Sequence, residues 1–270
     1  MKILSIYPFL TISSSAILIN GKIIAASTEE RFNREKNSTK FPEKSIEWCL
    51  EKAKLKWEDL DLIVVPWNPA HNFKNASRRW INDMRWRGEM LVNIPAHIMR
   101  MTNNQNPQNL EISWSNVRVK FLDHHEAHAA FSYYQSGFKK ASIVTIDGRG
   151  EEEAITISKG IGNKIKKIYS SNYPHSLGML YTSITEYLGF KPNSDEWKVM
   201  ALASYSKKKN KYDKKISKLF NFYENKFELD LSFFNFYTFD KQKFMFSKKF
   251  ENEFGASRSP NLNIEKRHIE

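Results

Sequence analysis

Alternating apolar and polar positions in the first seventy residues predict a small sheet with one helix. Residues 2–7 and 15–26 have the apolar character of β-strands, and the Asn-Gly pair at 20–21 is a strong signal for a two-residue hairpin turn. Apolar residues at helical spacing predict a helix over 43–55, and residues 62–66 form another short apolar run. The predicted order is therefore β-β-β-α-β.

A strand predicted over residues 117–122 leads directly into a helix over 124–136, and a second series of the same kind begins after that helix. Three strands are predicted next, over 141–147, 153–159 and 165–170. Two helices follow, over 176–189 and 195–204. A β-β-β meander followed by a helix thus occurs twice. This order predicts an α/β protein with the actin/hexokinase-like duplicated fold, in which hairpin turns from each of two lobes face a nucleotide across a cleft.

Composition divides the chain into three segments. Residues 1–122 form the predicted first lobe, which includes an aromatic and basic helix over 71–101 and an Asn/Gln-rich loop over 102–113. Residues 123–205 begin the second lobe, and residues 206–270 are a Lys- and Phe-rich part of it. Because a duplicated fold needs more strands and helices than these residues offer, we expect the second lobe to be incomplete.

The apolar content and the single cysteine narrow the possible classes of protein. Hydrophobic residues make up 41% of the 270, which is enough for a core and excludes global disorder. Cys49 alone can form neither an intramolecular disulfide nor a Cys-based zinc site, and it fits a reducing compartment. No apolar run approaches the ~18 residues of a membrane span, and Pro8 interrupts the first apolar run. We therefore expect a cytoplasmic protein without membrane contact.

The charge balance is strongly basic. The chain has 42 Lys and Arg against 30 Asp and Glu, a net charge of +12. Such a balance permits binding of nucleic acid or anionic ligands without establishing either. Seven lysines crowd between residues 207 and 218, but a solvated helix face explains them, and no recognised nucleic-acid-binding module surrounds them. Nucleic acid is therefore not an expected partner.

A cluster of histidines is the sharpest chemical feature. His124 and His128 are four residues apart, so a helix places both imidazoles on one face, where they can bind one divalent metal. Imidazole suits iron, zinc, nickel or copper better than calcium. Asp123 or Glu126 could orient a ligating ring by a hydrogen bond. The alternative is a pair of histidines that cap the helix or form hydrogen bonds in the core.

Two further segments could bind an anion. Gly148 and Gly150 follow Asp147 at the end of a predicted strand, and glycines let backbone amides approach an anion closely, while Asp147 could hold a metal or a water. A plain hairpin turn explains the same pattern. Arg31 and Lys36, with other basic residues nearby, could clamp a phosphate or carboxylate. A solvated charged loop is the alternative there.

His175 is a candidate general acid or base. Its reference pKa lies near neutrality, and it precedes Ser176, a plausible N-cap of the next helix. Helix capping and core packing explain the same residues.

Taken together, these segments resemble the O-carbamoyltransferases of the nodulation and antibiotic-tailoring type. Single motifs are modest, but five of them occur in the family's order and cover most of residues 1–205. The matching stretches are residues 13–36, 41–53, 123–138 (DHHEAHAAFSYYQSGF), 146–151 (IDGRGE) and 173–205.

The resemblance implies an N-terminal TsaD-like domain that moves a carbamoyl group from carbamoyl adenylate to a hydroxyl of a sugar or natural product. A YrdC-like domain, absent from these residues, would make the adenylate from carbamoyl phosphate and ATP. His124 and His128 match the family's metal-binding histidines, with iron as the favoured metal and zinc or magnesium as alternatives. Asp147 and His175 are the expected catalytic residues. Four residues are expected to contact the nucleotide or its carbamoyl group: Arg31, Lys36, Gly148 and Gly150.

Two departures from the family pattern matter. Ile12 and Ser13 stand where members of the family typically carry His and Asp, and the YrdC-like domain is missing. We therefore expect the 270-residue chain alone to be inactive for the full reaction. Two other functions stay open: a degenerate TsaD-like binding module without transferase activity, and a metal-dependent hydrolase, which lacks an evident third ligand.

Overall fold

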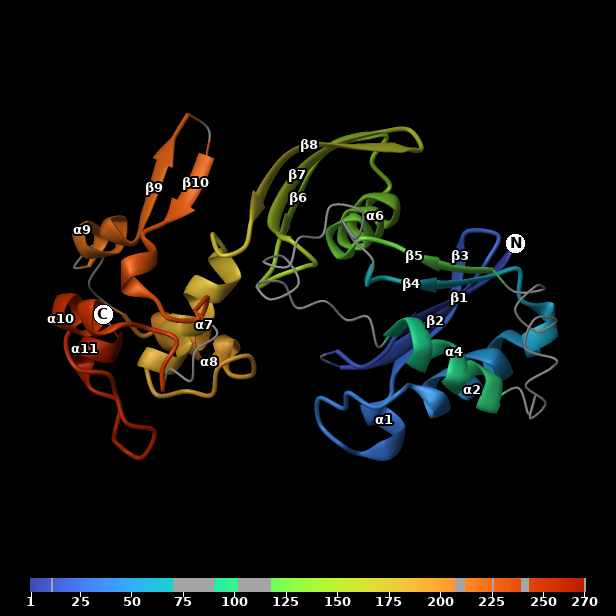
Figure 1. The fold of residues 1–270 in the computed structure, drawn as a ribbon, viewed down its shortest axis with the longest axis horizontal. Coiled ribbons are helices and arrows are strands. Elements are labelled where there is room, and N and C mark those ends of the chain that lie inside the picture. Colours follow the sequence, from blue (N-terminus) through green and yellow to red (C-terminus); the bar gives the residue numbers. More distant parts are fainter. Residues whose placement is uncertain are drawn as a thin grey trace. The chain divides into compact units, whose positions relative to one another are not determined.

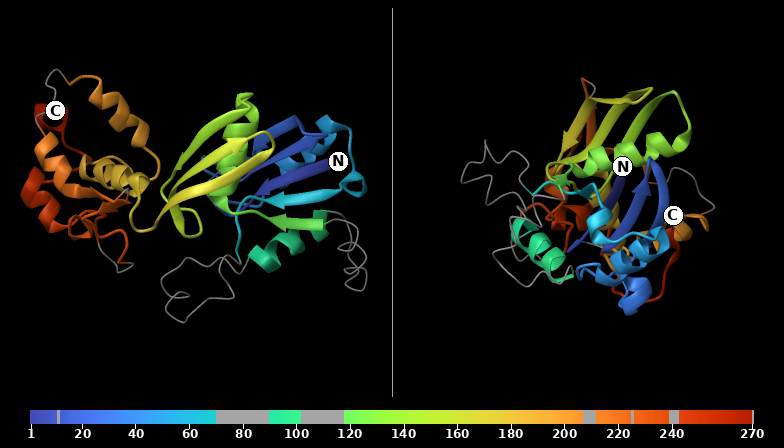
Figure 2. Two further views of the ribbon diagram at one scale, coloured as in Figure 1. Left: turned by 90° about the horizontal axis from the view of Figure 1, so that it is seen from above. Right: turned by 90° about the vertical axis from the view of Figure 1, so that its right-hand side faces the viewer.

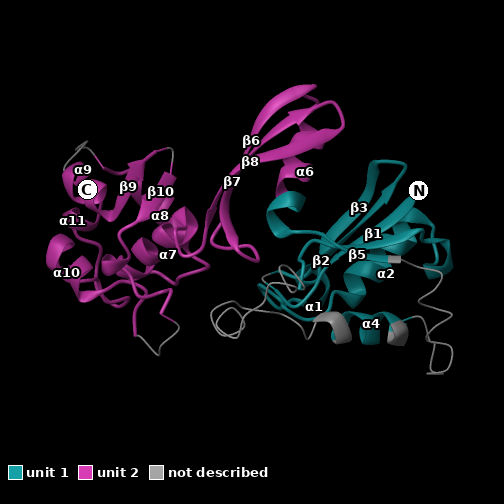
Figure 3. Cartoon of the chain, turned by 45° about the horizontal axis from the view of Figure 1, so that its top comes forward, with its two compact units in different colours: residues 1–127 teal, residues 128–270 magenta. Residues whose placement is uncertain are grey.

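The computed structural model describes residues 1–10, 12–69, 90–101, 118–206, 212–224, 226–238 and 243–269. The chain forms two compact units, residues 1–127 and 128–270 (Figure 3). Three sequence predictions lie outside the described residues: the part of the basic helix before residue 90, the loop over 102–113 and the lysines up to residue 211. None of the described helices is both long and apolar enough to cross a bilayer.

Unit 1 is built on a five-stranded mixed sheet (Figure 1). Its strands are β1 (Lys2–Tyr7), β2 (Ser14–Ile19), β3 (Lys22–Thr28), β4 (Leu62–Val65) and β5 (Arg118–Phe121). Their order in the sheet is β3-β2-β1-β4-β5; the first three form an antiparallel meander, and β4 and β5 run parallel to β1. Asn20 and Gly21 have φ angles of 50° and 80°, as a type I′ turn requires, so the predicted hairpin is confirmed.

Helix α2 (Glu43–Ala53) packs against β2 and β3, as the predicted β-β-β-α-β order requires. Ile46, Cys49 and Leu50 lie on its buried face in the core of unit 1. Burial raises the pKa of the Cys49 thiol, so this cysteine is a protonated core side chain at neutral pH. The unit also contains α1 (Glu30–Asn33), the 3-10 turn η1 (Trp57–Asp59) and α4 (Met90–Met101).

Unit 2 begins within a helix that lies along a second sheet. The elements are α6 (His124–Ser136), β6 (Lys140–Ile146), β7 (Glu153–Ile161) and β8 (Lys164–Asn172), and the strands form an antiparallel meander with α6 along one face (Figures 1 and 2). Ala129 and Tyr133 of α6 pack on Ile143 of β6. Gly160 of β7 leaves room for Tyr133, since a Cβ atom there would lie 2.5 Å from a ring carbon.

The rest of unit 2 is a Phe-rich cluster around the helix that follows the meander. Its helices, turns and strands are α7 (Leu177–Tyr187), α8 (Glu196–Ala203), α9 (Asp213–Ile216), η4 (Ser217–Leu219), β9 (Phe220–Tyr223), β10 (Lys226–Leu229), η5 (Leu231–Phe233), α10 (Lys248–Phe254) and α11 (Lys266–Ile269). Phe234, Phe246 and Phe250 are buried with Leu180 of α7. A meander followed by a helix therefore occurs in both units, and the predicted α/β class is confirmed.

Candidate functional site

Three parallel strands of unit 1 end beside His124. Tyr7 closes β1 and Trp67 follows β4, and their rings lie 6.4 and 5.5 Å from the buried imidazole of His124, which follows β5. The amide nitrogen Nδ2 of Asn68 donates to Asp123 Oδ1 at 2.9 Å, which ties the loop after β4 to the start of α6. The carboxyl ends of neighbouring parallel strands are where open α/β sheets bind ligands.

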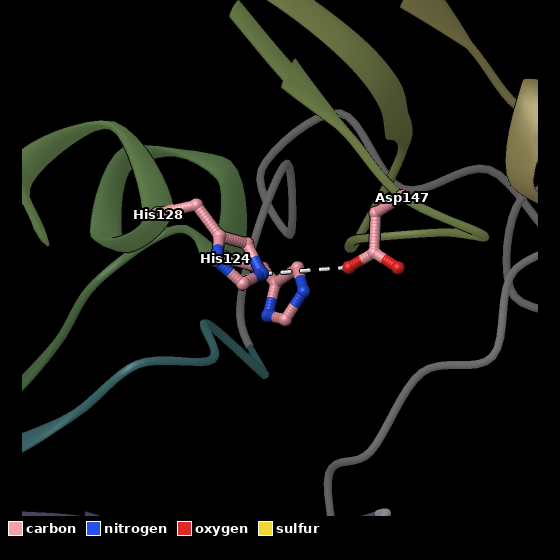
Figure 4. Close-up of side chains that lie close together, drawn as sticks. All are labelled: His124, His128 and Asp147. Atoms are coloured by element: carbon pink, nitrogen blue, oxygen red, sulfur yellow. Dashed lines mark ion pairs between the residues drawn. The ribbon is translucent and has the colours of Figure 1, made fainter. Parts of the chain in front are cut away.

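Helix α6 carries His128 one turn after His124, on the same face. In unit 2, Asp147 directly follows β6, and its Oδ2 lies 3.5 Å from His128 Nε2. One ligand atom from each of these three side chains lies within 4.8 Å of the others (Figure 4). The two predicted metal ligands and one predicted catalytic residue therefore form a single group.

The chemistry of this group suits a divalent transition metal. Two imidazole nitrogens and one carboxylate oxygen are donors that iron(II) and zinc accept. Ligand atoms about 2.1 Å from one ion lie roughly 3–4 Å apart, so small side-chain rotations would close the group around an ion. Magnesium prefers oxygen ligands, so this donor set fits iron or zinc better than the magnesium alternative.

The N-terminus of α7 holds the Asp147 turn in place. Ser176 is the N-cap: its Oγ accepts from Met179 N at 3.0 Å and lies 3.0 and 2.8 Å from the carbonyl oxygens of Asp147 and Gly148, to which it can donate. Gly178 lies against the peptide group between Asp147 and Gly148. A Cβ atom at Gly178 would lie 2.5 Å from Gly148 N and 2.6 Å from Asp147 O. The sequence indicated a cap at Ser176, but no local pattern links Gly178 to a turn thirty residues earlier.

The predicted anion cradle at Gly148 and Gly150 is not what this turn shows. The amide of Gly148 donates to Asp147 Oδ1 at 2.6 Å, and the amide of Gly150 donates to Glu153 O at 2.7 Å. Both amides are thus hydrogen bonded within the hairpin. The alternative, a plain hairpin turn, describes them better.

His175, predicted as an acid or base, lies in a packing position. Its Nδ1 accepts a hydrogen bond from the backbone amide of Leu229 in β10 at 3.0 Å, and its backbone carbonyl accepts one from Ser171 Oγ at 3.1 Å. Within the described part of the chain, the His175 ring makes no hydrogen bond to His124, His128 or Asp147. The ring therefore fastens β10 to the loop before α7.

Arg31 and Lys36, predicted to contact a nucleotide, are both exposed. Among the described residues, neither forms an ion pair or a side-chain hydrogen bond. The buried residue of this segment is Glu29, whose Oε2 accepts the amide of Ser45 in the first turn of α2 at 2.9 Å. A carboxylate is favourable at the N-terminus of a helix. In the sequence Glu29 stands in a run of charged residues, so nothing distinguishes it as a helix-stabilising carboxylate.

Ile12 has an unusual backbone conformation. Its φ of 58° lies in the left-handed region, which is strained for a β-branched side chain, and the residue is 40% exposed. We expect Ile12→Asn to stabilise the chain by about 1 kcal/mol, a rise in Tm of about 2–4 °C, measured by thermal unfolding. Ile23→Asn is the control, because Ile23 is 44% exposed in strand β3 and does not have a positive φ angle. An equal change in Tm in both variants would contradict the assignment of backbone strain to Ile12.

The sequence of the chain is similar to that of several known proteins and matches one protein family over most of its length. The model of the family described as "Carbamoyltransferase N-terminus" matches residues 2–268. Nodulation protein NolNO of Sinorhizobium fredii is 33% identical over 195 residues, which cover 71% of this chain and 27% of that protein. An uncharacterized protein of Synechocystis, sll1178, is 31% identical over 225 residues, 77% of this chain and 35% of that protein. The chain thus spans about a third of the length of these relatives.

Solved structures are more distant. YeaZ from Pseudomonas aeruginosa aligns with a TM-score of 0.33 and 14% identity, over 64% of this chain and 67% of that chain. Component A of (R)-2-hydroxyglutaryl-CoA dehydratase from Acidaminococcus fermentans aligns with a TM-score of 0.40 and 16% identity, over 78% of this chain and 61% of that one.

Proposed function

Since the chain belongs to the carbamoyltransferase family through its N-terminal domain, we propose that it holds the metal of an ATP-dependent O-carbamoyltransferase. The proposed reaction moves a carbamoyl group from carbamoyl adenylate to a hydroxyl of a sugar or natural product. Carbamoyl phosphate and ATP would be used by a YrdC-like domain outside these residues. The observation that carries the proposal is the grouping of His124, His128 and Asp147, because these donors fit a metal and lie in a domain of this family.

Each residue of the group has a distinct proposed role. A bound iron or zinc ion supplies Lewis-acid polarisation of the carbamoyl oxygen. His124 and His128 would each offer an imidazole nitrogen to the ion, and Asp147 would offer a carboxylate oxygen. The rings of Tyr7 and Trp67 beside His124 fix the orientation of its imidazole. Asp147 in turn is held through its backbone by the capped end of α7.

In the proposed transfer, an acceptor hydroxyl oxygen bonds to the carbamoyl carbon, and the bond from that carbon to the phosphate oxygen of the adenylate breaks. AMP leaves with the electron pair, and the hydroxyl proton is released to water. The three side chains and their metal therefore need to orient the carbamoyl carbonyl and stabilise the negative charge that develops on its oxygen. A preorganised site provides such electrostatic stabilisation.

Binding of a non-hydrolysable sulfamoyl analogue of carbamoyl adenylate tests this function. We expect the iron- or zinc-loaded chain to bind the analogue at least about ten-fold more tightly than the metal-free chain, since a metal Lewis acid contributes several kcal/mol at such a group. Isothermal titration calorimetry measures both affinities, and AMP alone is the matched ligand without the carbamoyl group. Equal affinity with and without metal would contradict the proposal.

A further inference from the structure

One end of the β6–β8 sheet is rich in lysine, and the two segments that form it contain no acidic residue. Residues 134–146 and 154–172 together contain six lysines and no aspartate or glutamate. Lys167 forms an ion pair with Glu153, which lies between the two segments. Among the described residues, no carboxylate forms an ion pair with the other five lysines: Lys139, Lys140, Lys159, Lys164 and Lys166.

The register of the strands brings these lysines together. Lys140 lies opposite Ile161, which lies opposite Lys164 on its other side. Two residues further along β7, Lys159 lies directly opposite Lys166, and like charges in that position destabilise a sheet. The sheet therefore holds a repulsive cluster whose charge is available to an anionic partner.

Apolar side chains are exposed beside these lysines. Phe138, Tyr134 and Ile161 are 66%, 51% and 50% exposed. Two hydrogen bonds join the segments that carry them: Tyr134 Oη donates to Asn163 O at 3.1 Å, and the amide of Gly162 donates to Lys139 O at 2.9 Å. The result is an ordered sheet end, here called the lysine tip: Tyr134, Phe138, Lys139, Lys140, Ile161, Lys164 and Lys166.

We propose that the lysine tip docks on the surface of an anionic lipid bilayer. Phe138 and Ile161 would enter the headgroup region while the lysines lie near the lipid phosphates, the arrangement that peripheral anchors use. This goes beyond the proposed transferase function and does not depend on it. It also differs from the sequence-based expectation of no membrane contact, which rested on the absence of a spanning segment.

The composition of the tip favours lipid over nucleic acid. Exposed aliphatic side chains such as Ile161 gain nothing from phosphates or base edges, but they gain from leaving water for a lipid interface. The two segments contain no arginine, the residue that recognises guanine or phosphate by a bidentate fork. Lysine point charges are sufficient for a diffuse anionic surface.

Co-sedimentation of the whole chain with vesicles tests the proposal. Vesicles of phosphatidylcholine alone are compared with vesicles that contain about 30% phosphatidylserine, at low and high salt. We expect binding at least about ten-fold tighter to the anionic vesicles, weakened in 0.5 M salt, because each lysine near such a surface contributes about five-fold in affinity and salt screens it.

Two matched pairs of variants locate the contact. Replacing four tip lysines by glutamine (Lys139, Lys140, Lys164 and Lys166) is expected to weaken binding at least about 100-fold. The same replacement at four exposed lysines of unit 1 (Lys44, Lys52, Lys54 and Lys56) is expected to change it less than about three-fold. Phe138→Ala is expected to weaken binding several-fold, whereas Phe131→Ala, equally exposed two turns earlier, leaves it unchanged. Circular dichroism checks that each variant is folded.

Three results would overturn the proposal. The first is no binding to anionic vesicles at low salt. The second is an equal loss of binding in the tip and control lysine variants, which would assign the effect to net charge. The third is tighter binding of a single-stranded RNA than of vesicles with the same dependence on the tip lysines, which would make the tip a nucleic-acid surface.

Discussion

Replacing His128 with alanine is expected to lower the affinity of the chain for Fe²⁺ and Zn²⁺ by at least roughly 100-fold, because losing groups that merely orient a ligand already costs about 10–100-fold. His128 Nε2 lies 3.5 Å from Asp147 Oδ2, so its removal takes away one of three converging donors. Titration against a chromophoric chelator at neutral pH measures the change.

His175→Asn is the matched control for that variant. Asparagine keeps an acceptor near the position of His175 Nδ1, which accepts the amide of Leu229, so folding should be preserved. We expect this variant to bind metal like the original chain. Equal losses in the two variants would show that any histidine replacement disturbs the protein, and full metal binding by His128→Ala would remove the metal site altogether.

Gly178→Ala is expected to destabilise unit 2 by about 1–3 kcal/mol, the usual cost of overpacking. The added methyl group would lie 2.5 Å from Gly148 N and 2.6 Å from Asp147 O, both backbone atoms that cannot rotate away. The turn that carries Asp147 must then shift, so metal affinity should also fall by about ten-fold. Urea unfolding and the chelator titration measure the two effects.

Gly148→Ala tests the same contact from its other side. A Cβ atom at Gly148 would meet only Met179 Sδ at 3.7 Å, an ordinary van der Waals distance. We expect its effect on stability to stay below about 1 kcal/mol. If both glycine variants behave alike, close approach between α7 and the Asp147 turn is not what holds the site.

Local patterns in the sequence were enough to predict the strands of both meanders and helix α2, which follows the first meander. The Asn-Gly pair at 20–21 dictates positive φ angles, and the apolar spacing of α2 dictates its buried face. These features depend on neighbouring residues alone. By contrast, the parallel pairing of β4 with β1 and of β5 with β4 joins strands that are distant in sequence, and no local pattern specifies their order.

The same distinction applies to the site. His124 and His128 could be grouped from the sequence because four residues on one helix place them together. Their association with Asp147 depends on how α6 meets the end of β6, which the sequence does not reveal. Gly148 and Gly150 were predicted as anion donors because the sequence cannot show that their amides bond within the hairpin. His175 was predicted as catalytic for a similar reason, since its partner Leu229 lies in a distant strand.

X-ray absorption spectroscopy of the metal-loaded chain tests the central claim most directly. With one equivalent of Fe²⁺ or Zn²⁺, we expect a first shell of nitrogen and oxygen at about 2.0–2.2 Å together with the outer-shell scattering of two imidazole rings. His128→Ala should reduce this to one ring. A spectrum without imidazole scattering, like that of the ion in water, would contradict the assignment of His124, His128 and Asp147 as a metal site.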